Sequence, residues 1–232
     1  MDFNNMLSYC RALEMNNNRT WFHENHKQYE QAKEDFTELV ERVKFAVAER
    51  VDLATQERII FADPKLMMYR IPRDARVYKN KPPYNPTWRA YISPDKKQLL
   101  PLGYVLMVAP DGRSHFGTGA WCPDGDYLRR VRDYVAENYA ELEELLEESG
   151  LELKGEKLKR VPREYEAEHP AGEYLKHKSW LLLENVPESA MESFDTYMSH
   201  VCALMDKMEP LRRYFQRALE DRKESLWDRL YR

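Results

Sequence analysis

The apolar positions of the first fifty residues follow the spacing of amphipathic helices. A short helix is predicted over residues 5–15, and it ends at three consecutive asparagines, a residue that readily takes the left-handed conformation of a helix end. A second apolar stripe recurs at helical spacing while the glutamates and lysines between its members face water. This stripe consists of Tyr29, Phe36, Val40, Val43 and Val47. We expect the second helix to run to about Arg50.

Over residues 58–122 the pattern changes to short runs rich in Ile, Val, Tyr and Phe, divided by prolines, which is typical of strands. The clearest hairpin joins residues 104–109 to residues 114–120 across a turn. A competing signal is Asp63 followed by Pro64, a cap and first-turn pair that could start a short helix instead.

Helical spacing returns over residues 127–148 and ends at Gly150. Residues 179–186 are predicted to form one late strand, and residues 191–230 a long helix that could break at Pro210. Helices, then strands, then helices with a late strand predict an α+β fold. We expect an antiparallel or mixed sheet flanked by the N-terminal and C-terminal helices.

Length and composition favour one globular domain over residues 1–232, because no repeat or low-complexity linker divides the chain. The longest apolar run, residues 99–109, is shorter than the roughly 20 residues that span a bilayer, and no secretory signal is visible. We therefore expect a cytoplasmic protein without a membrane partner.

The chemistry-bearing motifs are few. Three widely separated cysteines lack the spacing of a zinc site or a disulfide framework, and His23 and His26 miss the four-residue spacing of a zinc helix. Gly117 and Gly119 lack the third glycine of a dinucleotide loop, so tight strand packing explains them better. We expect neither a metal nor a cofactor, and the sequence assigns no catalytic residue or reaction.

Positive charge is concentrated in one short segment of an acidic chain. The net charge of −4 argues against bulk attraction to nucleic acid, so any anion binding must be local. Residues 70–89 carry six positive side chains against Asp74 alone, a local charge of +5. The six are Arg70, Arg73, Arg76, Lys79, Lys81 and Arg89.

Prolines indicate that this segment is a strand running into a rigid loop. Pro72 disrupts a helix and biases Ile71 to an extended conformation, and Pro82-Pro83 and Pro86 repeat the effect. In an extended chain Arg70 and Arg76 lie on one side and Arg73 on the other, unless a turn redirects them.

The arginines suit a phosphate or carboxylate ligand, because a guanidinium donates two parallel hydrogen bonds. The expected ligand-binding residues are Arg70, Arg73, Asp74, Arg76, Lys81 and Tyr84. Arginines that pair with acidic residues and fasten the loop to the body are the structural alternative.

Several ordered blocks of the sequence resemble one family. The blocks are Arg70, Arg73-Asp74, Arg76, Asn80-Lys81 and Pro83-Tyr84, then "NNNRTWFHENHKQYE" from Asn16, "GTGAWCP" from Gly117, "GEKLKRVPREY" from Gly155 and "HPAGEYLKHKSW" from His169. Together they resemble the bacterial and fungal family catalogued as domain of unknown function 2461, over roughly residues 6–219. The resemblance implies a site but no activity. Val77 stands where an aromatic residue is usual and Asn80 where aspartate is commoner, which weakens a role for position 80 as a metal ligand or base.

A second basic stretch lies between residues 154 and 178, and it could either share an electropositive pocket with the first or form separate solvated loops. Its cations are Lys154, Lys157, Lys159, Arg160, Arg163, Lys176 and Lys178, with His169 and His177 among them.

Two hypotheses remain. In the first, the basic loop binds a phosphorylated small molecule. In the second, the chain is an interaction module for a protein or single-stranded nucleic acid, and the arginines are structural. Tyr78, Tyr84, Trp88 and Tyr91 alternate with the cations as in grooves that stack bases, although aromatic residues in a sheet more often belong to the core.

Overall fold

The computed structural model describes residues 1–74, 76–77, 79–94, 103–122 and 125–230, with side chains up to Leu219. It forms two compact units. Unit 1 comprises Met1–Gln98, Tyr104–Phe116 and Glu184–Leu204, and unit 2 comprises Leu99–Gly103, Gly117–Leu183 and Met205–Arg232. The single globular domain over residues 1–232 stays a prediction.

Unit 1 begins with three helices, and side-chain caps fix the starts of the first two. Helix α1 (Phe3–Met15) is followed by the short α2 (Arg19–Glu24) and by α3 (His26–Ala48), which carries the expected apolar stripe. The Asp2 carboxylate accepts hydrogen bonds from two backbone amides of the first turn of α1, so this helix starts two residues before the predicted position.

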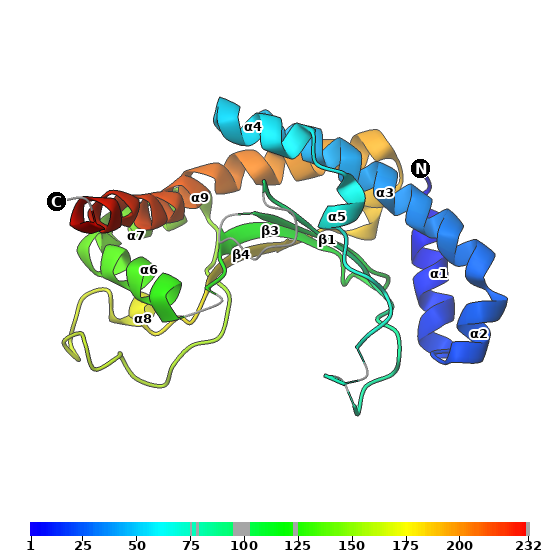
Figure 1. Ribbon diagram of the computed structural model, residues 1–232, viewed down its shortest axis with the longest axis horizontal. Coiled ribbons are helices and arrows are strands. Elements are labelled where there is room, and N and C mark those ends of the chain that lie inside the picture. The colour runs from blue at the N-terminus through cyan, green and yellow to red at the C-terminus, as the bar shows by residue number, and fades with distance from the viewer. Residues whose placement is uncertain (75, 78, 95–102, 123–124, 231–232) are drawn as a thin grey trace. The chain divides into compact units, whose positions relative to one another are not determined.

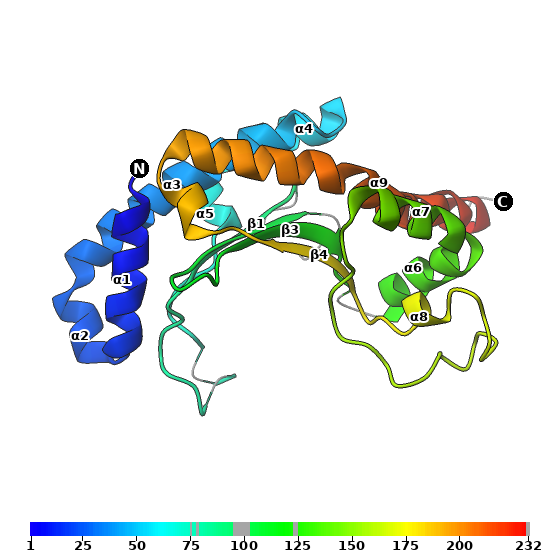
Figure 2. The ribbon, with the colours of Figure 1, turned by 180° about the vertical axis from the view of Figure 1, so that it is seen from behind.

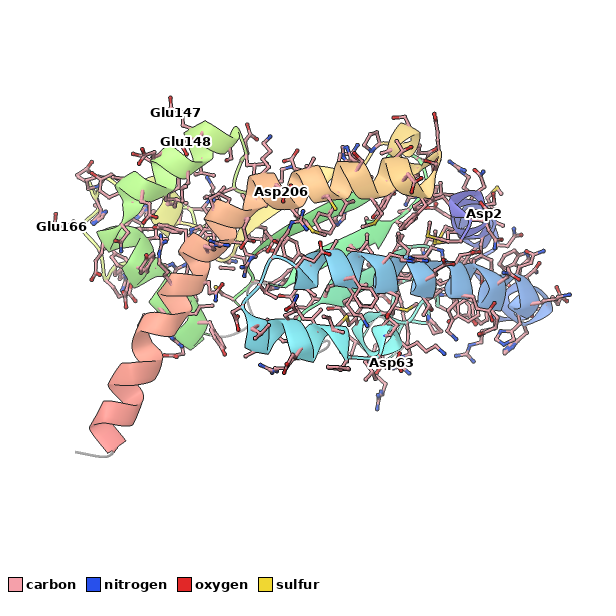
Figure 3. The ribbon with its side chains drawn as sticks, turned by 90° about the horizontal axis from the view of Figure 1, so that it is seen from above. Asp2, Asp63, Glu147, Glu148, Glu166 and Asp206 are labelled. Carbon is pink, nitrogen blue, oxygen red and sulfur yellow. The ribbon has the colours of Figure 1, made fainter. Side chains whose placement is uncertain are left out.

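Two further helices precede the sheet, where strands were expected. Helices α4 (Leu53–Ile60) and α5 (Pro64–Met67) start at the caps Asp52 and Asp63. The prediction of strands from residue 58 onward was therefore wrong for these residues, and the competing Asp63-Pro64 signal was the correct one. Figure 3 shows α4 beside α3, with Asp63 labelled where α5 begins.

A buried lysine holds α4 against α3. The Lys44 side chain is 2 % exposed, and its Nζ donates to the backbone oxygens of Ile60 and Ala62, each at 2.9 Å. Its charge is balanced by Glu41, 2.8 Å away. The cation therefore satisfies carbonyls that the end of α4 leaves without helical partners.

The sheet is antiparallel and has four strands among the described residues, in the order β1-β2-β3-β4. The strands are β1 (Trp88–Ile92), β2 (Tyr104–Val108), β3 (His115–Ala120) and β4 (Trp180–Asn185). In unit 1, α3 and α5 pack against β1 on one face of the sheet (Figure 1). The α+β fold with flanking helices is confirmed.

The hairpin between β2 and β3 has the predicted position. Asp111 and Gly112 take positive φ values of 59° and 69°, which a tight hairpin turn requires. The Ser114 hydroxyl donates to Ala109 O and accepts from Ala109 N, so the turn closes with side-chain as well as backbone bonds.

Unit 2 contains α6 (Gly125–Glu137), α7 (Tyr139–Ser149) and α8 (Gly172–Leu175), and α9 (Phe194–Leu230) runs through both units. The single helix expected over residues 127–148 is divided at Asn138, whose carbonyl accepts from Leu142 N at 3.4 Å and from the Tyr214 hydroxyl at 3.1 Å. Gly150 ends α7 in the left-handed conformation, as predicted. Helix α9 continues through Pro210, so the suggested break there is absent.

The glycines of β3 lie against the backbone of β4. A Cβ atom built on Gly117 would lie 2.1 Å from Leu182 O, and one on Gly119 would lie 2.2 Å from Trp180 O. The interpretation of these glycines as tight strand packing is confirmed.

We expect Gly117→Ala to destabilise the protein by about 2 kcal/mol or more, because the added methyl group must push β4 away. Gly125→Ala is the matched control, since a Cβ on Gly125 meets nothing within 4 Å. Urea unfolding of both variants measures the difference, and equal midpoints would contradict the close contact between β3 and β4.

Candidate anion-binding site

The basic segment forms an extended arm between α5 and β1, here called the basic arm and defined as residues 69–87. Its two sides pair through Arg73 N to Pro83 O and Asn85 N to Ile71 O, both at 2.8 Å. It leaves the sheet on the side away from α3 (Figures 1 and 2). Of the predicted strand that runs into a loop, the structure has the loop, with isolated antiparallel bridges of Met68 to Ala90 and Pro72 to Tyr84 in place of a strand, while Ala75 and Tyr78 lie outside the described residues.

Arg73 fastens the two sides of the arm together. Its Nη1 donates to Pro82 O at 2.8 Å and to Tyr84 O, and its Nη2 donates to the Asn85 side chain at 3.2 Å. The acceptors are two backbone carbonyls and an amide, rather than the carboxylates that the structural alternative had named. Arg73 therefore shapes the arm.

Tyr84 anchors the arm to the helices of unit 1. It is 7 % exposed, and its ring stacks on Phe22 with centroids 4.2 Å apart and planes at 8°. The Asn17 side chain accepts from Tyr84 N and donates to Tyr84 O, both at 3.0 Å. These are the two hydrogen bonds that a residue of a neighbouring strand would form with Tyr84. Sequence reasoning missed Asn17, because its asparagine triplet indicated only a helix end.

Asp74 and Arg76 form an exposed pair at the turn of the arm. Asp74 Oδ1 accepts from the Arg76 amide at 2.9 Å, and Asp74 Oδ2 accepts from Arg76 Nη2 at 2.7 Å. This bonding, together with the charge of Arg70, lowers the pKa of Asp74 below its ordinary value. The Arg76 side chain is nevertheless 90 % exposed, so a ligand can reach the guanidinium.

Arg70 and Lys81 are also exposed on the arm. The structure therefore divides the predicted site residues into two groups. Arg73 and Tyr84 face inward and hold the arm, whereas Arg70, Arg76 and Lys81 face water with Asp74 between them in sequence.

Of the aromatic residues that alternate with the cations, the three that the structure describes belong to the core. Trp88 and Tyr91 are 2 % exposed, and the ring of Trp88 stacks on that of Tyr29 with centroids 5.9 Å apart. With Tyr84 they are buried, so these three residues offer no surface on which bases could stack.

The second basic stretch belongs to unit 2 and pairs with the start of β4. Lys154 N donates to Leu181 O and Leu158 N to Lys176 O, both at 2.7 Å. Lys178 forms an ion pair with Glu156 at 2.9 Å. Because the arm lies in unit 1, the pocket shared by the two basic stretches stays a prediction.

His177 is buried within this second stretch. Its Nδ1 lies 3.2 Å from Ser179 O, and burial lowers the pKa of the imidazole below its ordinary value. The ring is therefore neutral near pH 7 and supplies no positive charge there.

Within the described ranges, no group of three or more His, Cys, Asp and Glu side chains is arranged to hold a metal ion. Among the described residues, Cys10, Cys122 and Cys202 form no disulfide bond. His23 and His26 contact aromatic rings, including that of Phe22. None of the helices, over the part of the chain that the structure describes, is both long and apolar enough to cross a membrane.

A family model described as conserved hypothetical protein (DUF2461) matches residues 5–214. No curated protein and no solved structure matches the chain. The match covers the basic arm and the second basic stretch.

Arg73→Ala should lower the free energy of unfolding by about 1–3 kcal/mol, because two carbonyls of the arm lose a charged donor. Arg76→Ala removes the same charge from an exposed pair and should leave the unfolding midpoint unchanged. Urea unfolding and the rate of proteolysis within residues 69–87 test both variants. Equal effects of the two substitutions would mean that Arg73 does not hold the arm.

Proposed function

The chain belongs to the DUF2461 family, which carries no assigned reaction, and we propose from its own residues that it binds a phosphate-bearing ligand through the basic arm. Arg70, Arg76 and Lys81 make the contacts with the ligand. Arg73, Asp74 and Tyr84 fix the geometry of those contacts.

The observation that carries this proposal is an arm of fixed shape with exposed arginines. Arg73 and Asn17 hold the backbone of the returning side, and prolines restrict it further. A ligand that binds a preorganised loop loses little free energy in ordering it.

Local charge supports an anion as the ligand. Residues 70–81 carry five cationic side chains against Asp74 in a chain of net charge −4, so an anion is attracted to the arm rather than to the whole surface. The guanidinium of Arg76 retains donors beyond those used by Asp74, since an arginine has five N–H groups.

Exposure of these cations favours a ligand whose phosphates project from a larger molecule. Arg70 and Arg76 lie on the surface of the arm, where a phosphate group can approach without entering a cavity. The buried state of Tyr84, Trp88 and Tyr91 argues that the phosphates, and not stacked bases, supply the affinity.

Fluorescence anisotropy with labelled ATP and with a labelled single-stranded oligonucleotide tests the proposal. The double substitution Arg70→Ala and Arg76→Ala should weaken binding of the favoured probe at least about tenfold, the loss expected when charge-assisted hydrogen bonds disappear. Inorganic triphosphate should compete with the probe, because the phosphates carry the recognition.

Lys207→Ala is the matched control, since Lys207 is an exposed cation of α9 outside the arm. This variant should bind the probe with the affinity of the parent protein. Probe binding that is the same in the parent and in the double variant would refute the arm as the site. A steep salt dependence restricted to the oligonucleotide would identify a polyanion as the ligand.

A further inference from the structure

Arg132, on α6 in unit 2, is a half-buried cation with few partners. Its Nη2 donates to the backbone oxygen of His177 at 3.0 Å. Its Nε is buried and has no hydrogen-bond partner among the described residues. A single carbonyl thus accounts for the hydrogen bonding of a group with five N–H donors.

Several other arginines of unit 2 have carboxylate partners, whereas Arg130 donates to the carbonyl of Leu219 and, like Arg132, has a buried Nε without a hydrogen-bond partner. Arg129 pairs with Asp126 at 2.6 Å, Arg212 pairs with Glu209 at 2.7 Å, and Arg217 pairs with Glu141. Within the described ranges no carboxylate lies within ion-pair distance of Arg132, and burial lowers the pKa of its guanidinium. A partly desolvated charge without a counter-ion is costly, which is the usual condition of a site that binds an ion of opposite sign.

The neighbouring carboxylate is engaged elsewhere. Asp133 follows Arg132 on α6, and its Oδ1 accepts from the Tyr165 hydroxyl at 2.7 Å. Glu164 and Cys122 lie near enough to influence Arg132 electrostatically, without an ion pair. The guanidinium therefore remains available on its solvent side.

Three of the sequence blocks meet around this arginine. Cys122 lies in the block that begins at Gly117, Tyr165 ends the block that begins at Gly155, and His177 lies in the block that begins at His169. The first block precedes α6 and the other two follow α7, and the basic arm uses none of them.

We propose that Arg132 binds a small oxyanion, a phosphate or carboxylate group, at a site formed by α6 and residues 164–177. The guanidinium supplies the charge and its planar donors. The carbonyl of His177 fixes the orientation of the side chain, and Tyr165 keeps Asp133 from neutralising it. This site lies within unit 2 and does not depend on the proposed function of the arm.

Thermal unfolding of the full chain with inorganic phosphate and with acetate, at constant ionic strength, tests this site. The parent protein should show a saturable rise in Tm with at least one of the two anions. Arg132→Gln should abolish this rise, while Arg129→Gln, which removes an ion-paired arginine of the same helix, should retain it.

A second readout separates ligand binding from a structural role. Without added anion, Arg132→Gln should unfold no lower than the parent, because it removes a desolvated charge and keeps a donor for His177 O. A lower Tm combined with no anion effect on the parent would make Arg132 a structural residue and overturn the inference. The inference would also be overturned if the rise in Tm with anion were lost in the double variant Arg70→Ala and Arg76→Ala but kept in Arg132→Gln.

Arg132→Lys covers the case in which Arg132→Gln does not fold. An ammonium keeps the charge but lacks the planar fork, so the affinity for the stabilising anion should fall at least about tenfold. Unchanged affinity in this variant would contradict the proposed recognition.

Discussion

The shape of the basic arm depends on donors that its own backbone lacks. Pro82, Pro83 and Pro86 have no N–H groups, so the returning side cannot form a regular ladder with residues 70–74. Carbonyl oxygens are left in excess, and the guanidinium of Arg73 bonds to two of them. The same residues that stiffen the arm thus create the need for an internal arginine.

This need explains why neighbouring arginines differ in role. The Arg73 side chain turns inward and donates to the carbonyl oxygens of Pro82 and Tyr84, so backbone dipoles stabilise its charge. Side chains that turn outward are exposed, and Arg76 stays accessible although it pairs with Asp74, so their charge can attract an approaching anion. A sum of charges along the sequence counts both kinds equally, although only the outward group is accessible to a ligand.

Features set by local sequence were predictable, and features set by distant partners were not. The apolar stripe of α3, the Asp111-Gly112 turn and the end of α7 at Gly150 depend on residues within a few positions. Asn138, which separates α6 from α7, accepts a hydrogen bond from Tyr214, a residue 76 positions away. Asn17 holds Tyr84 across 67 positions, and no periodicity records such a pairing.

The position of Lys44 has a consequence for chemical reactivity. An amine that donates to two carbonyls and lies beside Glu41 is inaccessible to acylating reagents and to modifying enzymes while α3 and α4 stay in contact. Its labelling rate would therefore follow the opening of this pair of helices rather than the nucleophilicity of the amine. Lys44 is therefore a native reporter of local unfolding between α3 and α4.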